Sequence, residues 1–347
     1  MDLRKKVAVL LSGGVDSSVC AFLLQKQGFD VVALTGKMFN SVCADDIVNN
    51  AKQVSQALGI EHYVCDVSKK FDEKVIKYFE QAYLKGETPN PCIMCNKYIK
   101  WGELFDFAFN TLKVDYIATG HYANIVEKDG GYTLFPAKDE KKDQLYYLFE
   151  LNQEQLSKTI FPLSNLEKSE IRKIAQENNL PSKSSNESQD ICFIPKPMTT
   201  KKYLFERFEE KIGDFVLKST GQKMGKHNGA WQFTIGQRKG IGIAYKEPLY
   251  VVGTDVENNI VFVGLKEELY SNALKIANIN FQSGLALDNF EAQIKVRYNM
   301  PKEMAKISRI DDGFLVKLEN PISAVTKGQA LVIYDKVDGS LIGGAWI

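Results

Sequence analysis

The chain has 347 residues, of which 44% are hydrophobic, and it carries 44 Lys and Arg against 43 Asp and Glu. These values are those of a folded protein of two or three domains, and they exclude a disordered chain, a collagen and a generally basic nucleic-acid coat. No apolar run reaches the roughly 20 residues of a transmembrane helix or begins like a secretory signal, so we expect a cytoplasmic protein with reduced cysteines and no membrane partner.

The first 180 residues alternate short apolar strands with helices. Residues 7–11 are a fully apolar run typical of a buried parallel strand, and helical spacing continues over 19–24 up to Gly28. Further strands are predicted at 31–34, 62–65 and 114–118, and further helices at 45–58, 71–84 and 96–112. This alternation predicts an α/β fold with a doubly wound, Rossmann-like parallel sheet, whose ligand site lies at the carboxyl ends of the strands.

The turn after the first predicted strand is rich in glycine and hydroxyl groups: Ser12-Gly13-Gly14-Val15-Asp16-Ser17-Ser18. Glycines let the backbone approach a ligand, and hydroxyls at a helix N-terminus can hold phosphate oxygens. The absence of a following Lys argues against the Walker-type loop of γ-phosphate transfer. A capping turn would explain the two glycines alone, but the whole segment resembles the PP-loop of ATP pyrophosphatases, which cleave ATP between its α and β phosphates.

A C-x-x-C motif stands just ahead of the helix predicted at 96–112, in the segment Thr88-Pro89-Asn90-Pro91-Cys92-Ile93-Met94-Cys95-Asn96. A helix N-terminus is expected to lower the pKa of such thiols and to favour the reactive thiolate. A Pro- and Asn-rich loop is poorly suited to burying two cysteines, and a zinc site lacks a second pair of ligands. A thioredoxin-like pair stays open, although the surrounding pattern differs.

The charge of the chain changes after about Pro195. Residues 196–247 carry 11 Lys and Arg against 5 Asp and Glu, whereas residues 1–195 carry 23 against 26. An RNA partner would therefore be held through local basic surfaces, and Arg238 and Lys239 are candidates.

The C-terminal part has the pattern of short antiparallel strands. Strands are predicted at 293–298, 314–318 and 330–334, with Asp-Gly turn signals at 312–313 and 338–339. We therefore predict a PP-loop catalytic domain at 1–205, a small basic central domain at 206–272 and a C-terminal antiparallel β-barrel at 273–347.

Cys192 lies beside Ile191 and Phe193 and, taken alone, would be a packing residue. In combination with the other motifs, the chain resembles the tRNA-specific 2-thiouridylases of the bacterial MnmA/TrmU type, within the PP-loop ATP pyrophosphatase superfamily. The likeness runs from residue 7 to the C-terminus, and its motifs are the PP-loop, the C-x-x-C segment, Ala118–Tyr122, Lys142–Gln144, Ser188–Ile194 and Thr234–Arg238.

The resemblance implies that ATP adenylates the C2 oxygen of a wobble uridine, which is then converted to 2-thiouridine with release of AMP and pyrophosphate. Asp16 would help to hold Mg²⁺. The ATP-binding residues implied are Leu10, Leu11, Ser12, Gly13, Gly14, Val15, Asp16, Ser17, Met38 and Gly120.

The resemblance also implies that Cys192 carries the sulfur as a persulfide and that Cys95 is the nucleophile, leaving a Cys95–Cys192 disulfide. The implied partners are tRNAs for Lys, Glu and Gln and a sulfur-donor protein, either a cysteine desulfurase or a sulfur-relay carrier. The tRNA contacts implied are Asn90, Pro91, Cys92, His121, Lys142, Asp143, Gln144, Arg297, Tyr298 and Gln329.

The role of Cys92 stays open, because some members of the family have Asp at this position. That carboxylate has been assigned a role in acid–base catalysis. The thiol could take that role, pair with Cys95 in a resting disulfide, or ligate metal. Cys92, Cys95 and Cys192 could together bind three irons of a [4Fe–4S] cluster. Cys43 also matches a family position, without a role.

Two other functions compete with thiolation. Another PP-loop enzyme, such as an amide-forming synthetase or a tRNA lysidine synthetase, would also adenylate its substrate but needs no cysteine pair. A non-enzymatic RNA-binding or iron–sulfur scaffold protein would have no use for an ATP loop.

Overall fold

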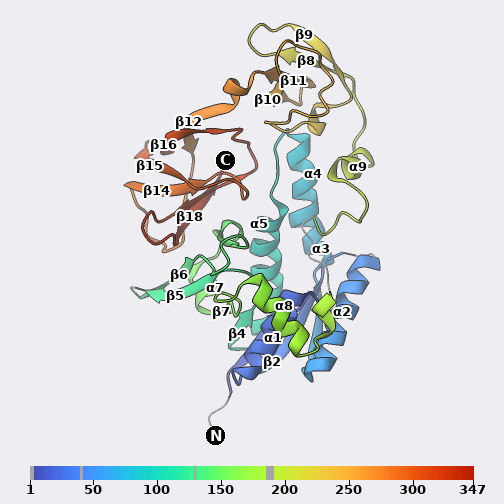
Figure 1. Cartoon of the computed structure of the whole chain (residues 1–347), viewed down its shortest axis with the longest axis vertical. Helices are drawn as coiled ribbons and strands as arrows, with labels where there is room; N and C mark the ends of the chain where they lie inside the picture. The colour runs from blue at the N-terminus through green and yellow to red at the C-terminus, as the bar shows by residue number, and fades with distance from the viewer. Residues whose placement is uncertain (1–3, 40–41, 129, 185–190) are drawn as a thin grey trace.

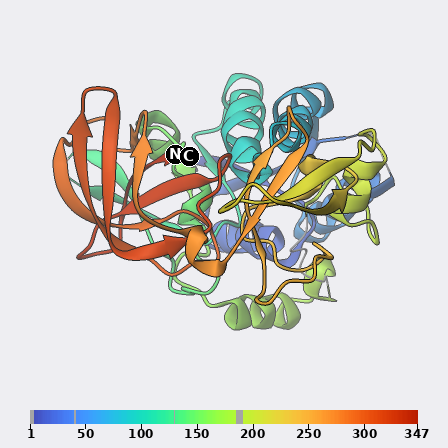
Figure 2. The same cartoon turned by 90° about the horizontal axis from the view of Figure 1, so that it is seen from above.

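A computed structural model describes residues 4–39, 42–128, 130–184 and 191–347. Figure 1 shows a parallel sheet with its helices at the bottom, a small sheet at the top and a larger antiparallel sheet at the left. Seen from above in Figure 2, the larger antiparallel sheet lies to the left and the small sheet to the right. No helix in the described part of the chain is long and apolar enough to cross a membrane.

The N-terminal sheet has five parallel strands in the order β3-β2-β1-β4-β7. Val7, Ala8 and Val9 of the central strand are fully buried, because helices cover both faces of the sheet. This confirms the predicted doubly wound parallel sheet. The strands are β1 (Lys6–Leu10), β2 (Asp30–Lys37), β3 (His62–Asp66), β4 (Tyr116–Ala118) and β7 (Thr159–Ile160).

The helices around this sheet follow the predicted positions, with one shift. The helix predicted from residue 96 begins at Pro91, so the C-x-x-C motif forms its first turn. Pro91 is suited to this first position because a helix leaves its first N–H groups unpaired. The segments are α1 (Val15–Lys26), α2 (Val42–Leu58), α3 (Ser68–Phe71), η1 (Asp72–Ile76), α4 (Lys77–Leu84), α5 (Pro91–Cys95), η2 (Asn96–Glu103) and α6 (Leu104–Asn110).

A hairpin and short helices complete the N-terminal unit and lead to the central segment. The hairpin strands are β5 (Asn124–Lys128) and β6 (Gly131–Phe135). The helices are η3 (Leu145–Tyr147), α7 (Gln153–Ser157), α8 (Lys168–Glu177), η4 (Pro181–Ser184) and α9 (Thr200–Phe205).

The central segment forms a four-stranded sheet in the order β10-β11-β8-β9, in which only β8 and β11 run parallel. Its own apolar core includes Phe215, Val251 and Val261. Its elements are β8 (Gly213–Leu217), β9 (Lys223–His227), η5 (Ala230–Gln232), β10 (Tyr250–Asp255), β11 (Ile260–Gly264) and η6 (Lys266–Leu269).

The C-terminal segment is a curled antiparallel half-barrel of seven strands in the order β12-β16-β15-β14-β17-β18-β13. The strand predicted at 330–334 is confirmed as β17, and both predicted Asp-Gly turns connect strands. The strand predicted at 293–298 lies earlier, in β14. The strands are β12 (Tyr270–Ile276), β13 (Asn280–Phe281), β14 (Asn289–Lys295), β15 (Glu303–Ile310), β16 (Gly313–Ser323), β17 (Ala330–Tyr334) and β18 (Leu341–Trp346).

Candidate active site

The PP-loop connects β1 to α1 and is closed by its own hydroxyl groups. Ser12 N–H donates to Ser17 Oγ at 3.2 Å, and Ser17 and Ser18 donate to the carbonyl of Gly14 at 3.1 and 2.8 Å. The loop lies at the carboxyl end of β1. Met38 follows β2 and Gly120 follows β4, so the fold brings all ten predicted ATP-binding positions to one edge of the sheet.

At two positions in this region the backbone lies so close to neighbouring residues that only glycine fits. Gly13 has φ +75°, and a Cβ there would come within 2.5 Å of the Asn50 side chain. Gly120 packs against the start of α1, where a Cβ would lie 3.1 Å from Asp16. The loop therefore sits tightly against α2 and the end of β4.

The carboxylate of Asp16 is already engaged. Lys168 Nζ donates to both of its oxygens at 2.6 Å, and the Tyr122 hydroxyl donates to Oδ1 at 2.8 Å. Lys168 comes from α8, which packs beside α1 (Figure 1). A Mg²⁺ ion that is held by one or two carboxylates together with phosphate oxygens fits Asp16 as its protein ligand, provided that Lys168 releases the carboxylate.

The fold brings Cys192 to the C-x-x-C motif. The Phe193 ring anchors this segment, with its centroid 5.9 Å from Phe71 and 5.2 Å from Phe79 in edge-to-face contacts. Phe193 and Cys95 belong to the same apolar core cluster, and Ile191 packs against it, so both chain neighbours of Cys192 are anchored beside Cys95. The other part of this motif, Ser188–Asp190, lies outside the described residues, as does the Cys43 side chain.

The three thiols differ in exposure. Cys95 is only 8% exposed and packs in the main apolar core, whereas Cys92 and Cys192 reach solvent. The prediction that this segment is unsuited to burying cysteines is therefore wrong for Cys95, because the earlier start of the helix turns that residue inward. All five described cysteines are free thiols, so no disulfide joins them in this structure.

The surrounding protein raises the pKa of all three thiols, to about 11 at Cys95 and about 12 at Cys192. Loss of hydration is the largest cause, also at Cys92 and Cys192, where protein atoms surround the sulfurs although both residues keep exposed surface, and the positive charge of Lys100 opposes this effect at each sulfur. The predicted lowering of the pKa by the helix N-terminus is wrong in net direction, because loss of hydration outweighs it. These cysteines are held as thiols at neutral pH.

His121 connects the thiols to the PP-loop. Its Nε2 lies 3.3 Å from Lys100 Nζ, and its Nδ1 lies 2.7 Å from Thr119 Oγ1. Burial, and then Lys100, hold the pKa of His121 well below its ordinary value, so the ring is neutral. Since an ammonium can only donate, Nε2 accepts from Lys100 and Nδ1 carries the proton. Gly120, the residue before His121, packs against Asp16 of the PP-loop. His121 and Lys100 therefore lie beside the predicted nucleotide site.

Several predicted tRNA contacts surround the C-x-x-C motif. Asn90 caps α5, and Pro91 and Cys92 are its first residues. The centroid of the Tyr298 ring lies 4.7 Å from that of the Tyr147 ring, and the carbonyl of Tyr147 accepts from Asn96 Nδ2, next to Cys95, at 2.9 Å. These rings could stack an unpaired base beside the thiols.

Two predicted tRNA contacts make bonds that join parts of the fold. Gln329 Nε2 donates to the carbonyl of Thr88 at 2.9 Å, which ties β17 to the segment before the C-x-x-C motif. Arg297 donates to the carbonyls of Ile235 and Ala324 at 3.3 and 2.5 Å, and its burial lowers its pKa. Their direct contact with tRNA stays a prediction.

The turn Lys142–Gln144 is held beside His121 through its neighbour Tyr122. Gln144 Oε1 accepts from the N–H of Tyr122 at 3.0 Å. Asp143 accepts from the N–H groups of Ala137 and Leu145 at 3.3 Å each, and burial raises its pKa to about 6. Lys142 is half-buried in this turn.

Sequence reasoning missed Lys100 and Lys168. Lys100 lies in the π-helical segment η2, five residues after Cys95. The wider π-helical turn brings residues five apart closer to one face than an α-helix does, and no local pattern predicted that widening. Lys168 begins an ordinary amphipathic helix, so only its tertiary position distinguishes it from other lysines.

The three cysteines do not fit an iron–sulfur cluster in this arrangement. Within the described ranges, no three His, Cys, Asp or Glu side chains lie close enough together to hold a metal ion. All three thiols belong to the described residues.

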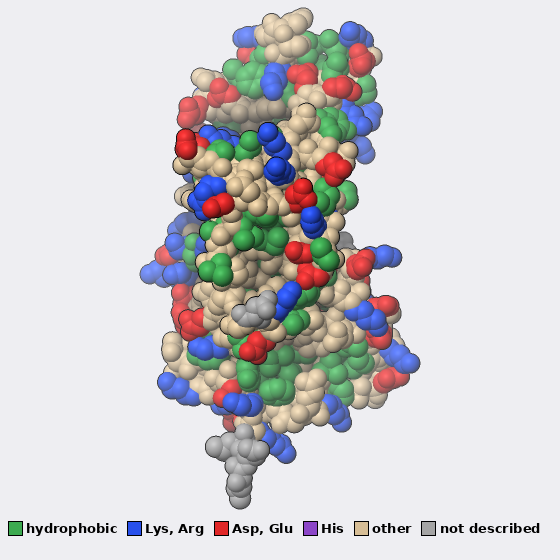
Figure 3. All heavy atoms as spheres, turned by 90° about the vertical axis from the view of Figure 1, so that its left-hand side faces the viewer, with side chains coloured by type: hydrophobic (Ala, Val, Ile, Leu, Met, Phe, Trp, Pro, Cys, Tyr) green, Lys and Arg blue, Asp and Glu red, His purple; other side chains and the backbone are tan. Residues whose placement is uncertain are grey.

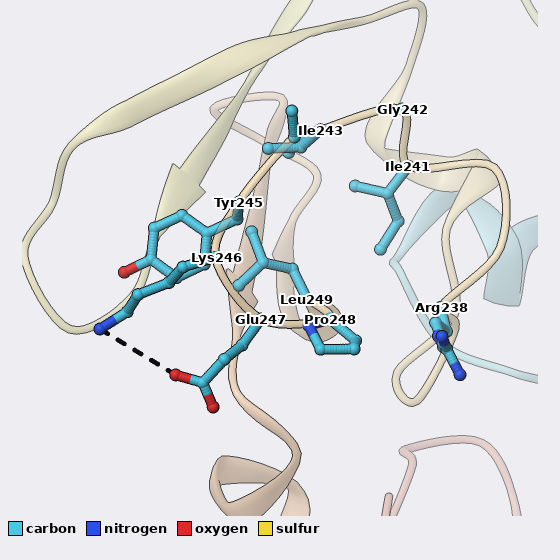
Figure 4. A pocket seen from close by; sticks show the side chains of 10 residues that line it. Arg238, Ile241, Gly242, Ile243, Tyr245, Lys246, Glu247, Pro248 and Leu249 are labelled. Atoms are coloured by element: carbon cyan, nitrogen blue, oxygen red, sulfur yellow. Dashed lines mark ion pairs between the residues drawn. The ribbon is translucent and has the colours of Figure 1, made fainter.

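On the face shown in Figure 3, Lys and Arg are interspersed with Asp and Glu. Arg238 and Lys239 are exposed in the central segment, and Arg238 lines a pocket of about 560 Å³ there. Figure 4 shows Arg238 across this pocket from the Lys246–Glu247 ion pair. None of the predicted ATP or thiol residues lines it.

Three family models match the chain in consecutive segments. A tRNA methyl transferase HUP domain matches residues 5–196, a tRNA methyl transferase PRC-barrel domain matches 201–265, and an aminomethyltransferase β-barrel domain matches 271–347.

Full-length relatives are more specific. The chain is 43% identical to tRNA-specific 2-thiouridylase MnmA 2 of Thermoanaerobacter sp. strain X514, over 100% of this chain and 99% of that protein. It is 42% identical to tRNA-specific 2-thiouridylase MnmA of Carboxydothermus hydrogenoformans, over 99% and 98% of the two chains. The enzyme of the same name from Clostridium acetobutylicum is also 42% identical, over 99% of each chain.

Proposed function

The chain belongs to the tRNA-specific 2-thiouridylase family, and on this premise we propose how its residues thiolate the wobble uridine of tRNA. Two matching domain models bear methyltransferase names, but the relatives that are 42–43% identical over the whole chain are thiouridylases. A PP-loop serves adenylation and a set of thiols serves sulfur transfer, whereas methyl transfer requires neither. The protein is a tRNA sulfurtransferase.

The first step is adenylation of the uracil. The C2 oxygen attacks the α-phosphorus of ATP, pyrophosphate leaves, and the base carries AMP as a leaving group. Ser12, Ser17 and the N–H groups at the start of α1 would hold phosphate oxygens. Asp16 would hold Mg²⁺, which supplies neutralisation of the phosphate charge. Met38 and Gly120 would complete the nucleotide site.

The second step is sulfur transfer. The terminal sulfur of a Cys192 persulfide attacks C2 and displaces AMP, so that Cys192 and the base are joined by a disulfide. The Cys95 thiolate then attacks the Cys192 sulfur, which forms the Cys95–Cys192 disulfide and releases the 2-thiouridine. An external thiol reductant must restore both cysteines before the next turnover.

The observation that carries this proposal is that Phe193 packs in the same apolar core cluster as Cys95, which brings Cys192 toward it, combined with the unequal exposure of the two cysteines. An exposed Cys192 can receive sulfur from a donor protein. A buried Cys95 is protected from that donor and from oxidation, and it acts only on a sulfur brought to it. Cys92 would stand between the incoming base and the other two thiols, as an auxiliary thiol or a proton acceptor.

The tRNA would present its wobble base as an unpaired nucleotide. Tyr298 and Tyr147 would stack it, at the small unstacking cost of a base in a loop. Asn90, Pro91, His121, Gln329, Arg297 and Lys142–Gln144 would line its approach. We expect tRNAs for Lys, Glu and Gln as substrates, a cysteine desulfurase or sulfur-relay carrier as donor, and the cytoplasm as the compartment.

Pyrophosphate release with purified protein, Mg²⁺, ATP and unmodified tRNA tests the proposal. Release should require tRNA and persist in Cys95→Ser and Cys192→Ser, while both variants lose 2-thiouridine formation. Cys20→Ser is the control, because this thiol lies on α1 and is buried in a different apolar cluster from Cys95. Full turnover in both serine variants would instead indicate another PP-loop enzyme. No release in the wild type would indicate a binding protein.

Anaerobic purification distinguishes the persulfide route from a cluster. The persulfide route predicts activity without iron or acid-labile sulfide in the protein. Stoichiometric iron whose removal abolished thiolation but not pyrophosphate release would contradict the route through Cys192.

A further inference from the structure

The side chain that binds the carboxylate of Asp16 is Lys168, from a distant part of the chain. Lys168 Nζ donates to both Asp16 oxygens at 2.6 Å, and the two side chains are only 12% and 29% exposed. The Tyr122 hydroxyl adds a third contact at 2.8 Å. The carboxylate of the PP-loop is thus covered by a cation from α8.

The backbone of Lys168 is fixed independently of its ammonium. Its backbone N–H donates to Asp139 Oδ2 at 3.0 Å, which fixes the first residue of α8. Its long side chain then extends over the Tyr122 ring, with Nζ 5.7 Å from the ring centroid. Rotation about its four side-chain bonds can move Nζ without moving the helix.

Asp16 cannot serve Lys168 and Mg²⁺ with the same oxygens. A Mg²⁺ ion with its shell of oxygen ligands requires at least one carboxylate oxygen to be free. ATP brings negative phosphates to the adjoining loop, and a lysine ammonium binds phosphate well as a point charge. If Lys168 moves to the phosphates as Mg²⁺ takes Asp16, neither charge is left unpaired in a half-buried site.

We propose that Lys168 occupies Asp16 in the nucleotide-free protein and moves onto the ATP phosphates when Mg²⁺–ATP binds. This exchange rests on the proposed ATP site. It assigns Lys168 two roles, as a cover that keeps Asp16 from binding a cation prematurely and as a phosphate ligand.

The exchange predicts opposite effects of one substitution on two ligands. In Lys168→Met, the free Asp16 should bind Mg²⁺ alone more tightly than the wild type does. Mg²⁺–ATP should bind about tenfold more weakly or worse, the size expected when one charge-assisted hydrogen bond is removed. Lys168→Arg should recover most of the ATP affinity. A merely structural role would weaken both ligands.

Titration calorimetry of the full-length protein measures both affinities. Lys173→Met is the matched control, because Lys173 lies on the same helix, is 74% exposed and pairs with Glu177 at 3.8 Å. It should leave both affinities unchanged. If Lys168→Met does not fold, Lys168→Gln and Lys168→Arg are compared in its place.

The outcomes separate this proposal from the proposed function. Mg²⁺–ATP bound equally by wild type and Lys168→Met would overturn the exchange alone. Parallel weakening of both ligands would also overturn it. A wild-type protein that bound no Mg²⁺–ATP would overturn the ATP site, and the exchange with it.

Discussion

Lys100 Nζ and His121 Nε2 lie 3.3 Å apart, between the PP-loop and the cysteines. Because this bond assigns the proton of the neutral imidazole to Nδ1, His121 is a fixed acceptor for Lys100 and does not act as an acid. The positive charge of this lysine lowers the pKa of Cys92, Cys95 and Cys192. One ammonium therefore opposes the effect of burial at all three thiols.

Replacing Lys100 should make the thiols less reactive. Lys100→Met removes the positive charge and should therefore raise the pKa of Cys95 and Cys192 by about a further half to one unit. Their alkylation by iodoacetamide at pH 8 should then slow by roughly threefold to tenfold. Peptide mass spectrometry measures each thiol separately. Lys70→Met is the control, since Lys70 pairs with Glu103 at 3.4 Å and removes the same charge outside the site. Equal rates in both variants would contradict this role of Lys100.

The reactivity of Cys95 should rise with pH throughout the neutral range. Burial raises its pKa to about 11, so the thiolate fraction, and with it the alkylation rate, should increase about tenfold per pH unit from pH 7 to pH 10. A variant with Cys92→Ser and Cys192→Ser removes the two other thiols of the site, and peptide mass spectrometry distinguishes Cys95 from Cys20, Cys43 and Cys65. A plateau below pH 9 would mean that the thiolate forms more easily than the burial of Cys95 allows.

Gly13 should tolerate no side chain. In Gly13→Ala the new Cβ would meet Asn50 at a residue with φ +75°, so the clash adds to backbone strain. We expect unfolding free energy to fall by about 1–3 kcal/mol and Mg²⁺–ATP binding to weaken. Gly28→Ala is a matched control with φ +90° and open space around the new Cβ, which should cost only about 1 kcal/mol. Urea denaturation measures both, and equal losses would show that the contact with α2 is unimportant.

Binding of tRNA should depend on salt through the exposed cations of the central segment. Arg238→Gln with Lys239→Gln should reduce the slope of log K against log salt by about 1–2, one unit for each phosphate that the variant no longer neutralises. Lys275→Gln with Lys336→Gln is the control, because these lysines already pair with Asp312 and Glu291. An unchanged slope would show that phosphates are held elsewhere.

The parts of the fold that depend on local pattern were predictable. The apolar run at 7–11 and the alternation of strands and helices predicted the parallel sheet, because burial on both faces leaves that signal in the sequence. The apolar run at 330–334 predicted β17 for the same reason, whereas the PP-loop was predicted from its glycines and hydroxyl groups. The start of the C-x-x-C helix was misplaced because Pro and Asn suggest a loop, although both are also favoured at a helix N-terminus.

The site depended on contacts that no local pattern contains. Cys192 approaches Cys95 because Phe193 packs against α3 and α4, and only the resemblance to a family paired these thiols beforehand. Lys168 reaches Asp16 across 152 positions. The raised pKa values of the thiols likewise follow from burial, which the Pro-rich segment did not suggest.

The nucleosides of tRNA test the central claim most directly. Mass spectrometry of tRNA from cells that lack this gene should find no wobble 2-thiouridine. The wild-type gene should restore it, and Cys95→Ser or Cys192→Ser should not. Wobble 2-thiouridine at normal levels in the deletion strain would contradict the account.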